Sequence, residues 1–158
     1  PLAMLPDEVD QDYLRDQVVI IGYGGVGRRL SENLIQQNIK VVIAEENREI
    51  VEKLRFEGIA AVTGEATEPG VLIQAHIQHA RLLVISPMDI LDIHRIVDIS
   101  KQLNAEIQVL ICAESKEEAV VIRKDNIGEV FYAKEEMAKN MRHHILNQIE
   151  LAHQSTAH

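Results

Sequence analysis

The chain has 158 residues and a formal net charge of −9, and 46% of its residues are hydrophobic although only 3% are aromatic. Length and composition fit one globular domain with an aliphatic core, and they exclude an intrinsically disordered chain. The acidic balance excludes the usual binders of DNA, RNA and anionic lipid, which need clustered Lys and Arg against phosphate.

The expected strands follow an N-terminal linker or arm, residues 1–16, which combines two prolines with scattered acids. From residue 17 onward, short apolar runs alternate with segments of helical periodicity. Six strands are expected, at Val18–Ile21, Lys40–Ala44, Ile59–Val62, Leu82–Ile85, Ile107–Cys112 and Val130–Tyr132. Their apolar runs are continuous rather than alternating, which is typical of strands buried on both faces of a parallel sheet.

A helix is expected after each strand, because apolar residues recur there at helical spacing. The second helix ends near Gly58, a residue type that suits the left-handed position after a helix. The apolar sets of the six helices are Val26 to Leu34, Ile50 to Leu54, Val71 to Ala75, Ile90 to Leu103, Ala119 to Ile122 and, between about Lys134 and Ala152, Met137, Met141, Ile145 and Ile149.

This alternation predicts the α/β class, with a Rossmann-like, doubly wound parallel sheet of six strands in the order 3-2-1-4-5-6. We expect the nucleotide-binding domain to span residues 17–133. Residues 134–158 are expected to form a C-terminal helix and tail that serve as a dimerisation or crossover element.

The first strand-to-helix turn, Gly22-Tyr23-Gly24-Gly25-Val26-Gly27, has the pattern G-x-G-x-x-G in the context that binds nucleotides. Gly22 would permit the tight turn, Gly24 would let the backbone approach a phosphate, and Gly27 would let the helix pack closely on the sheet. An acidic protein can hold a phosphate there, because the helix N-terminus offers free N–H groups and a positive dipole end. The alternative is a glycine-rich turn without a ligand.

Glu45 stands at the end of the second expected strand, about 20 residues after the glycine loop. A carboxylate there can accept hydrogen bonds from both ribose hydroxyls of an adenosine, and it would repel a 2′-phosphate. NADP(H) is therefore disfavoured as a ligand. The alternative is a solvated acid in a turn, since Glu46 lies beside it.

Three further polar residues each have two readings. Arg28 either contacts the phosphate or pairs with Glu32, four residues later on the same helix face. Thr67, in Gly64-Glu65-Ala66-Thr67, faces the adenine side of the cleft, caps the next helix, or does both. Ser86 reaches the phosphate–ribose region or is an ordinary strand-end hydroxyl.

Other chemistry finds little support in the sequence. His76 with His79 and His143 with His144 lack partners at a recognised ligand spacing, so no metal site is expected. Cys112 is the single cysteine, which precludes an internal disulfide and suggests a reducing compartment.

Neither a membrane-spanning apolar run nor a secretion signal is found. Only one helix follows the sixth strand, so a substrate region for a dehydrogenase is missing, and we expect a sensor rather than an enzyme.

The stretch from Gln17 to about Leu151 resembles the TrkA-N family, also called the RCK N-terminal or KTN family, and especially the C-terminal domains of KefB- and KefC-like cation/proton antiporters. The residues that carry the resemblance are Val19 to Gly27, Glu45, Gly64 to Thr67 and Ala80 to Val84. The resemblance implies that AMP, ADP, ATP or NAD(H) binds in the Rossmann cleft. It also implies a homodimer, and a membrane-embedded transporter domain at the cytoplasmic face of a bacterial inner membrane.

By position, Glu45 matches the family's ribose-binding acid, and Glu65, Ala66 and Thr67 match its adenine-side motif. The chain also departs from the family. Asp is frequent in the family where this chain has Glu45 and Glu65, and Arg is common where it has Gly25, which removes one cation near the phosphate. Glutathione-gated members are basic after the fifth strand, where this chain has Cys112 and Glu114, so glutathione gating is not expected.

The expected function is thus a cytosolic regulatory domain that senses AMP or NAD(H) and controls a potassium or cation/proton transporter. Two alternatives stay open: a fragment of an NAD-dependent oxidoreductase that lacks its substrate domain, and a dimerisation module without a ligand. Hydride turnover by the domain would favour the first alternative. Failure of every nucleotide to bind would favour the second.

Overall fold

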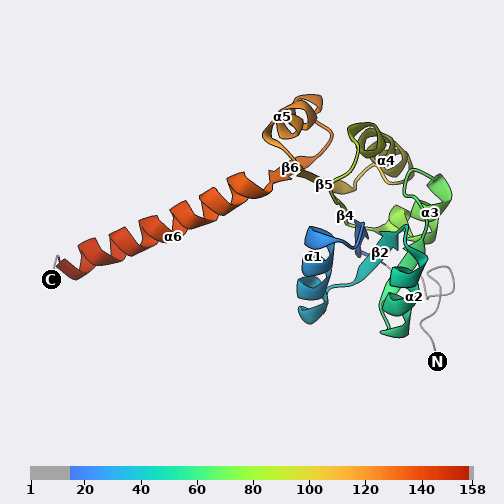
Figure 1. Cartoon of the computed structure of the whole chain (residues 1–158), viewed down its shortest axis with the longest axis horizontal. Helices are drawn as coiled ribbons and strands as arrows, with labels where there is room; N and C mark the ends of the chain where they lie inside the picture. The colour runs from blue at the N-terminus through green and yellow to red at the C-terminus, as the bar shows by residue number, and fades with distance from the viewer. Residues whose placement is uncertain (1–14, 157–158) are drawn as a thin grey trace.

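The computed structural model describes residues 15–156, and its sheet has six parallel strands in the order β3-β2-β1-β4-β5-β6. This confirms the expected fold class and strand order (Figure 1). The expected arm lies outside the described residues except for Arg15 and Asp16. The strands are β1 (Val18–Ile21), β2 (Val41–Glu45), β3 (Ala60–Thr63), β4 (Leu82–Ile85), β5 (Gln108–Ala113) and β6 (Glu129–Tyr132).

All six expected helices are present, together with a short 3-10 turn, η2 (Ile77–His79), before β4. They are α1 (Gly25–Gln36), α2 (Arg48–Phe56), α3 (Pro69–Gln74), α4 (Ile90–Leu103), α5 (Lys116–Asp125) and α6 (Ala133–Thr156). Gly58 has a φ of +83° directly after the C-cap of α2, which confirms its expected role at that helix end.

Aliphatic side chains form one core layer on each face of the sheet. Ile20 and Ile43 point to the face that α1 and α2 cover, whereas Val19, Ile21 and Val42 point to the face covered by α3, α4 and α5. Both faces are therefore buried at β1 and β2, which explains why these strand sequences are continuous apolar runs rather than alternating ones.

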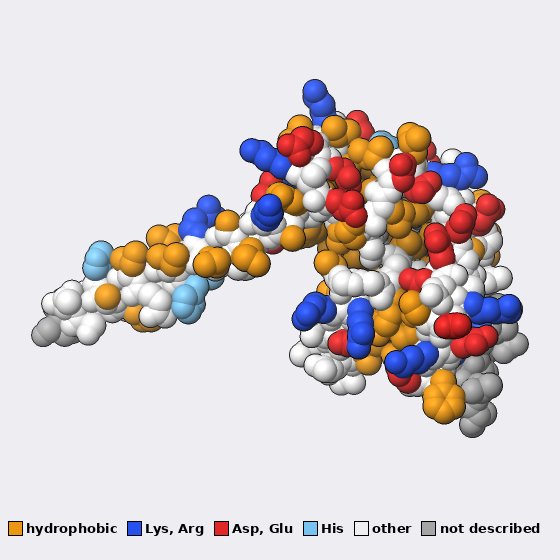
Figure 2. All heavy atoms as spheres, viewed as in Figure 1, with side chains coloured by type: hydrophobic (Ala, Val, Ile, Leu, Met, Phe, Trp, Pro, Cys, Tyr) orange, Lys and Arg blue, Asp and Glu red, His pale blue; other side chains and the backbone are white. Residues whose placement is uncertain are grey.

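The last helix is the one element that adds nothing to this core. β6 runs directly into α6, which extends away from the sheet, and none of its residues is buried (Figure 1). Apolar side chains line it along its length (Figure 2), including Met137, which is 65% exposed, and Ile149, which is 48% exposed.

Within residues 15–156, no helix is both long and apolar enough to cross a membrane.

Candidate functional site: a nucleotide cleft at the switch point of the sheet

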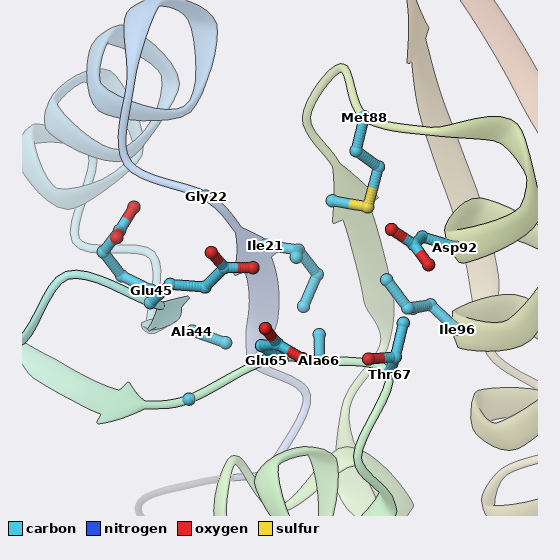
Figure 3. A pocket seen from close by; sticks show the side chains of 12 residues that line it. Ile21, Gly22, Ala44, Glu45, Glu65, Ala66, Thr67, Met88, Asp92 and Ile96 are labelled. Carbon is cyan, nitrogen blue, oxygen red and sulfur yellow. The ribbon is translucent and has the colours of Figure 1, made fainter.

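The candidate site lies where the sheet reverses its direction of winding. β1 pairs with β2 on one side and with β4 on the other, so the connections after β1 and β4 leave toward opposite faces and open a crevice at the carboxyl ends of the strands. A cavity of about 210 Å³ occupies this crevice (Figure 3). Its lining residues are Ile21, Gly22, Ala44, Glu45, Glu46, Gly64, Glu65, Ala66, Thr67, Met88, Asp92 and Ile96.

The glycine loop forms one margin of the cleft. Gly22 has a φ of +93°, and a Cβ atom on Gly27 would lie only 2.2 Å from the carbonyl oxygen of Gly22. These values confirm the tight turn at Gly22 and the close packing at Gly27. Gly24 is the N-cap of α1, and a Cβ atom there would meet nothing within 4 Å. Packing does not require glycine at this position, so the open space beside it suits the approach of a ligand.

The first turn of α1 supplies unused hydrogen-bond donors. In the part of the chain that the structure describes, the N–H groups of Gly25 and Val26 have no backbone acceptor. Such groups at a helix N-terminus attract anions, because the helix dipole adds to their partial positive charge.

Glu45 is held in place by the backbone on both sides of it. Its Oε1 accepts a hydrogen bond from the Tyr23 N–H at 3.1 Å, and its Oε2 accepts one from the Asn47 N–H. The carboxylate therefore joins the glycine loop to the turn that begins α2. Each carboxylate oxygen has a second lone pair, so Glu45 can still accept from ribose hydroxyls.

Glu65, Ala66 and Thr67 form the floor of the cavity as Figure 3 shows it, and Gly64 also lines the cavity. The Gly64 N–H donates to the Glu45 carbonyl at 3.1 Å, and a turn is closed by the Glu68 N–H and the Glu65 carbonyl at 3.0 Å. Ala66 and Thr67 are the central residues of that turn, and their N–H groups have no partner among the residues described.

The alternative reading of Thr67, as the cap of the next helix, is wrong. The N-cap of α3 is Glu68, followed by Pro69 in the first helical position, and no side chain caps this helix end. Pro69 explains the difference, because its fixed φ starts the helix one residue later and it has no N–H that needs a cap. Thr67 remains as a residue that lines the cavity.

The third wall comes from α4 and the residues before it, which the sequence analysis did not assign to the site. Met88, Asp92 and Ile96 are four residues apart and line the cavity from one side (Figure 3). Arg95 ties this wall to the floor, because its Nε donates to the Thr67 carbonyl at 3.0 Å. The spacing could have indicated this wall, since a helix after the switch-point strand turns one face to the crevice.

Seven of the expected site residues do not line the cavity: Tyr23, Arg28, Ser86 and, beyond Gly22, the glycine-loop residues Gly24, Gly25, Val26 and Gly27. Tyr23 and Arg28 line a separate cavity between α1 and α2, where Arg28 pairs with Glu32 at 3.0 Å, as its alternative reading proposed. Burial raises the pKa of Tyr23. Ser86 is buried behind the glycine loop, with its Oγ 3.1 Å from where a Cβ on Gly22 or Gly27 would be.

The electrostatic character of the cavity is strongly acidic. Glu45, Glu46, Glu65 and Asp92 all line it, whereas none of its lining residues is Lys or Arg. A phosphate bound here would therefore depend on backbone N–H groups and the α1 dipole rather than on side-chain cations. Among residues 15–156, no three side chains of His, Cys, Asp or Glu are grouped to hold a metal ion.

Comparison with known proteins gives two relatives that are membrane transporters by name. The chain is 28% identical over 126 residues to YbaL of Escherichia coli K12, a candidate cation/proton antiporter, covering 80% of this chain and 23% of YbaL. It is 23% identical over 140 residues to KefB of Alkalimonas amylolytica, a candidate K⁺ efflux antiporter, covering 89% of this chain and 21% of KefB. The chain thus spans about a fifth to a quarter of these relatives.

Solved structures that share the fold include the following three. The TrkA-N domain of the inner membrane protein YbaL from Escherichia coli superposes with a TM-score of 0.73 at 28% identity, over 82% of this chain and 96% of that domain. The AMP-bound Kef C-terminal domain of Shewanella denitrificans gives 0.67 at 19% identity, over 84% and 80% of the two chains. The NAD-bound GsuK channel gives 0.64 at 21% identity, over 82% and 23%.

A match to a protein-family model identifies the family of this chain. The model of the TrkA-N domain matches residues 18–133, which is well over half of the chain and includes every residue that lines the cavity. The chain belongs to the TrkA-N domain family.

Proposed function

We propose that this chain is a nucleotide-sensing regulatory domain of a cation/proton antiporter or a potassium channel, with AMP or NAD(H) as its ligand. One observation carries the proposal: Glu45, fixed by the Tyr23 and Asn47 N–H groups, stands between an open glycine loop and a floor with free N–H groups. The names of the relatives YbaL and KefB and the AMP and NAD complexes of similar folds support it.

In this arrangement the ligand lies across the cleft with its ribose at Glu45. Its phosphate meets the N-terminus of α1, and its base lies between the floor at Ala66 and Thr67 and the wall formed by α4. A 2′-phosphate on the ribose would face both Glu45 and Glu46, so NADP(H) is disfavoured.

A regulatory role also fits the side chains of the cavity. The titratable groups among the lining residues are four carboxylates, and no His, Cys, Lys or Tyr lines the cavity beside them. We therefore assign no catalytic residue. The same proposal places the domain at the cytoplasmic face of a bacterial inner membrane, next to the membrane-embedded part of its transporter.

Binding of the ligand must change the structure of an element that reaches the transporter. We propose that this element is a homodimer interface formed by α6. Its apolar side chains are all exposed: Met137, Met141, Ile145 and Ile149. A ligand can change the activity of such an assembly only if it binds one arrangement of the two subunits better than another. Residues 134–158 would then be the element that links binding to gating.

The test is a thermal-shift titration of the purified chain with AMP, ADP, ATP, NAD, NADH and NADPH. A ligand at about 100 times its Kd adds roughly 2.7 kcal/mol to the free energy of unfolding, which is a readily measured shift. We expect stabilisation by one or more of the adenosine ligands but not by NADPH. Replacing Glu45 by Ala should weaken the adenosine ligands and reduce the discrimination against NADPH.

The Gly24→Val variant separates binding from folding. The fold leaves open space where its Cβ would be, and the extended backbone at Gly24, with φ −98° and ψ 161°, accepts a β-branched residue. Stability without ligand should therefore change little while the ligand-induced shift disappears. Gly70→Val is the control, because Gly70 also has open space where its Cβ would be but lies in α3, away from the glycine loop and the N-terminus of α1. Normal binding by Gly24→Val would contradict the placement of the phosphate.

A further inference from the structure

A second cavity, of about 280 Å³, lies between α1 and α2 and shares no lining residue with the cleft at the switch point. Leu54 belongs to the core layer beneath the two helices, and Tyr23 and Ile50 pack against that layer, so the base of the cavity is apolar. Figure 2 shows apolar side chains between α1 and α2, with charged side chains of both signs around them. The lining residues are Tyr23, Arg28, Glu32, Ile50, Lys53, Leu54 and Glu57.

The charged residues of this cavity are two cations and two carboxylates. Arg28 and Glu32 already pair with each other, with the Arg28 Nε 3.0 Å from the Glu32 Oε1. Within residues 15–156, neither the Lys53 ammonium group nor the Glu57 carboxylate has a hydrogen-bond or ion-pair partner. One charge of each sign is therefore available to a ligand.

The local structure of α2 gives no reason for a carboxylate at Glu57. This residue is the C-cap of the helix, where the negative end of the helix dipole disfavours an acid. Lys53 is four residues earlier, but a Lys that precedes its Glu is the weaker order for such a pair, and the two groups form no bond here. A ligand cation at Glu57 would relieve this unfavourable charge.

The balance of charges defines the ligand class. A simple anion would meet the two carboxylates of the cavity, and a simple cation would meet its two basic groups, so each would be repelled as well as attracted. A zwitterion with one carboxylate and one ammonium group satisfies both Lys53 and Glu57. Ile50 and Leu54 suit an aliphatic side chain on the same molecule. An aliphatic α-amino acid combines these three groups.

We propose that the cavity between α1 and α2 is a second ligand site of this chain and that it binds a small zwitterion of the aliphatic α-amino acid class. The carboxylate of the ligand meets Lys53, its ammonium group meets Glu57, and its side chain contacts Ile50 and Leu54. The nucleotide cleft is the opposite case, because all four of its charged lining residues are acids.

Tyr23 connects this second site to the nucleotide cleft. Its side chain lines the cavity between the helices, whereas its backbone N–H donates to the Glu45 Oε1 at 3.1 Å. A ligand that moves the Tyr23 ring therefore also moves the carboxylate assigned to the ribose. We expect bound amino acid to change the nucleotide affinity by roughly two- to fivefold, and the nucleotide to change the amino acid affinity by the same factor. This coupling rests on the proposed function, whereas the binding of the amino acid itself does not.

The experiment is an NMR titration of the isotopically labelled whole chain with L-leucine, L-leucinamide and N-acetyl-L-leucine. Leucinamide lacks the carboxylate and N-acetyl-leucine lacks the ammonium group, so only leucine presents both charges. Lys53 and Glu57 are exposed to water, so we expect a Kd for leucine of roughly 1–10 mM. The amide shifts should concentrate in α2 and around Tyr23, and each derivative should bind about fivefold more weakly.

Two variants assign the charges. Lys53→Met should remove the preference for leucine over leucinamide, and Glu57→Gln should remove the preference for leucine over N-acetyl-leucine. Glu49→Gln is the matched control, because Glu49 is also exposed on α2 but does not line the cavity. This variant changes the charge as Glu57→Gln does and should leave all three affinities unchanged.

Equal binding of the three compounds would overturn the site, because the two free charges would then have no role. Absence of any shift at about 50 mM leucine would overturn it as well, whether or not nucleotides bind, since that concentration exceeds the expected Kd. A Kd for AMP that is the same with and without saturating leucine would overturn the coupling through Tyr23. Leucine binding by a chain that binds no nucleotide would support the second site and contradict the proposed function alone.

Discussion

Gly27 is the residue at which the glycine loop has no tolerance for a side chain. A Cβ atom there would lie 2.2 Å from the Gly22 carbonyl oxygen and 3.1 Å from the Ser86 Oγ. The carbonyl belongs to the main chain at the end of β1, so it cannot move aside without shifting the strand. The packing of the loop against the end of β1 therefore requires that residue 27 has no side chain.

We accordingly predict that Gly27→Ala lowers the free energy of unfolding by roughly 1–3 kcal/mol, the usual cost of overpacking. The measurement is the midpoint of urea unfolding, with the m-value as a check that the transition itself is unchanged. Gly70→Ala serves as the control, since Gly70 lies in α3 with open space around it and should be neutral or gain up to about 1 kcal/mol. Equal effects of the two substitutions would contradict the packing argument.

Cys112 gives a second prediction at this scale. Its side chain is partly buried on β5, and burial raises the pKa of the thiol. The thiolate is the reactive form, so a raised pKa lowers the fraction that can react near neutral pH. We expect alkylation by iodoacetamide at pH 8 to be roughly tenfold slower in the folded chain than in urea. A folded rate equal to the unfolded one would contradict the burial of the thiol.

Among the elements, α6 depends on one charged contact for its orientation at the sheet. Arg123 of α5 donates from Nη2 and Nη1 to the Glu135 carboxylate at 2.7 and 3.3 Å, and from Nη2 to the Val130 carbonyl at 3.2 Å. The contact thus connects α5, β6 and the first turn of α6. Because β6 enters α6 without a loop, this first turn fixes where the rest of the helix points.

We predict that Glu135→Gln speeds amide hydrogen exchange in residues 134–138 by about two- to fivefold, the range of exposed ion pairs. Arg123 holds the pKa of the Glu135 carboxyl below its ordinary value, chiefly through their hydrogen bond. A lowered pKa means that the contact stabilises the helix start above the ordinary range for Glu and is lost as the pH falls through the lowered pKa. The difference between variant and wild type should therefore vanish in acid.

Glu136→Gln is the control for this measurement, because it removes the same charge one residue later without removing a hydrogen bond to Arg123. It should leave exchange at the helix start nearly unchanged. Faster exchange in both variants would mean that the effect comes from overall charge rather than from the contact.

The elements also show where sequence reasoning succeeds and where it stops. The apolar runs located all six strands, because the central strands are buried on both faces and even β5 and β6, which are more exposed, keep apolar residues in succession. The apolar runs themselves do not include Glu45 and Thr63, the polar last residues of β2 and β3, which pair with each other. Glu45 was nevertheless expected at its strand end, from its distance to the glycine loop. The end of α6 was also missed, because a polar helix terminus at Thr156 leaves no apolar pattern.

The residues of the candidate site can likewise be separated into those that the sequence could predict and those that it could not. Gly22, Glu45, Glu65, Ala66 and Thr67 could be predicted because they come from a motif and from strand ends, and all five line the cavity. Met88, Asp92 and Ile96 were not predicted, because their helical spacing shows that they share a face but not that this face of α4 is turned to the cleft. Their role in binding, like that of the five predicted residues, is a prediction for the titrations above.

At the scale of the whole molecule, the unusual feature is a helix of 24 residues that buries none of its own side chains. A helix of that length extends about 36 Å, and an isolated helix in water is only marginally stable without tertiary packing. Met137, Met141, Ile145 and Ile149 recur every fourth residue and therefore form one apolar face. The helix needs a partner for that face, and we propose a second copy of the chain.

We predict that the chain is a dimer and that Ile145→Glu makes it monomeric, because a charge in the centre of a paired apolar face would be buried without a partner. Sedimentation equilibrium distinguishes the two states from the chain mass of 17.8 kDa. Asn147→Glu adds the same charge on the other side of α6 and should leave the dimer intact. A wild-type chain that is monomeric at high concentration would contradict the pairing of α6. A dimer that survives Ile145→Glu would place the interface elsewhere, and α6 would then be the segment that contacts the transporter directly.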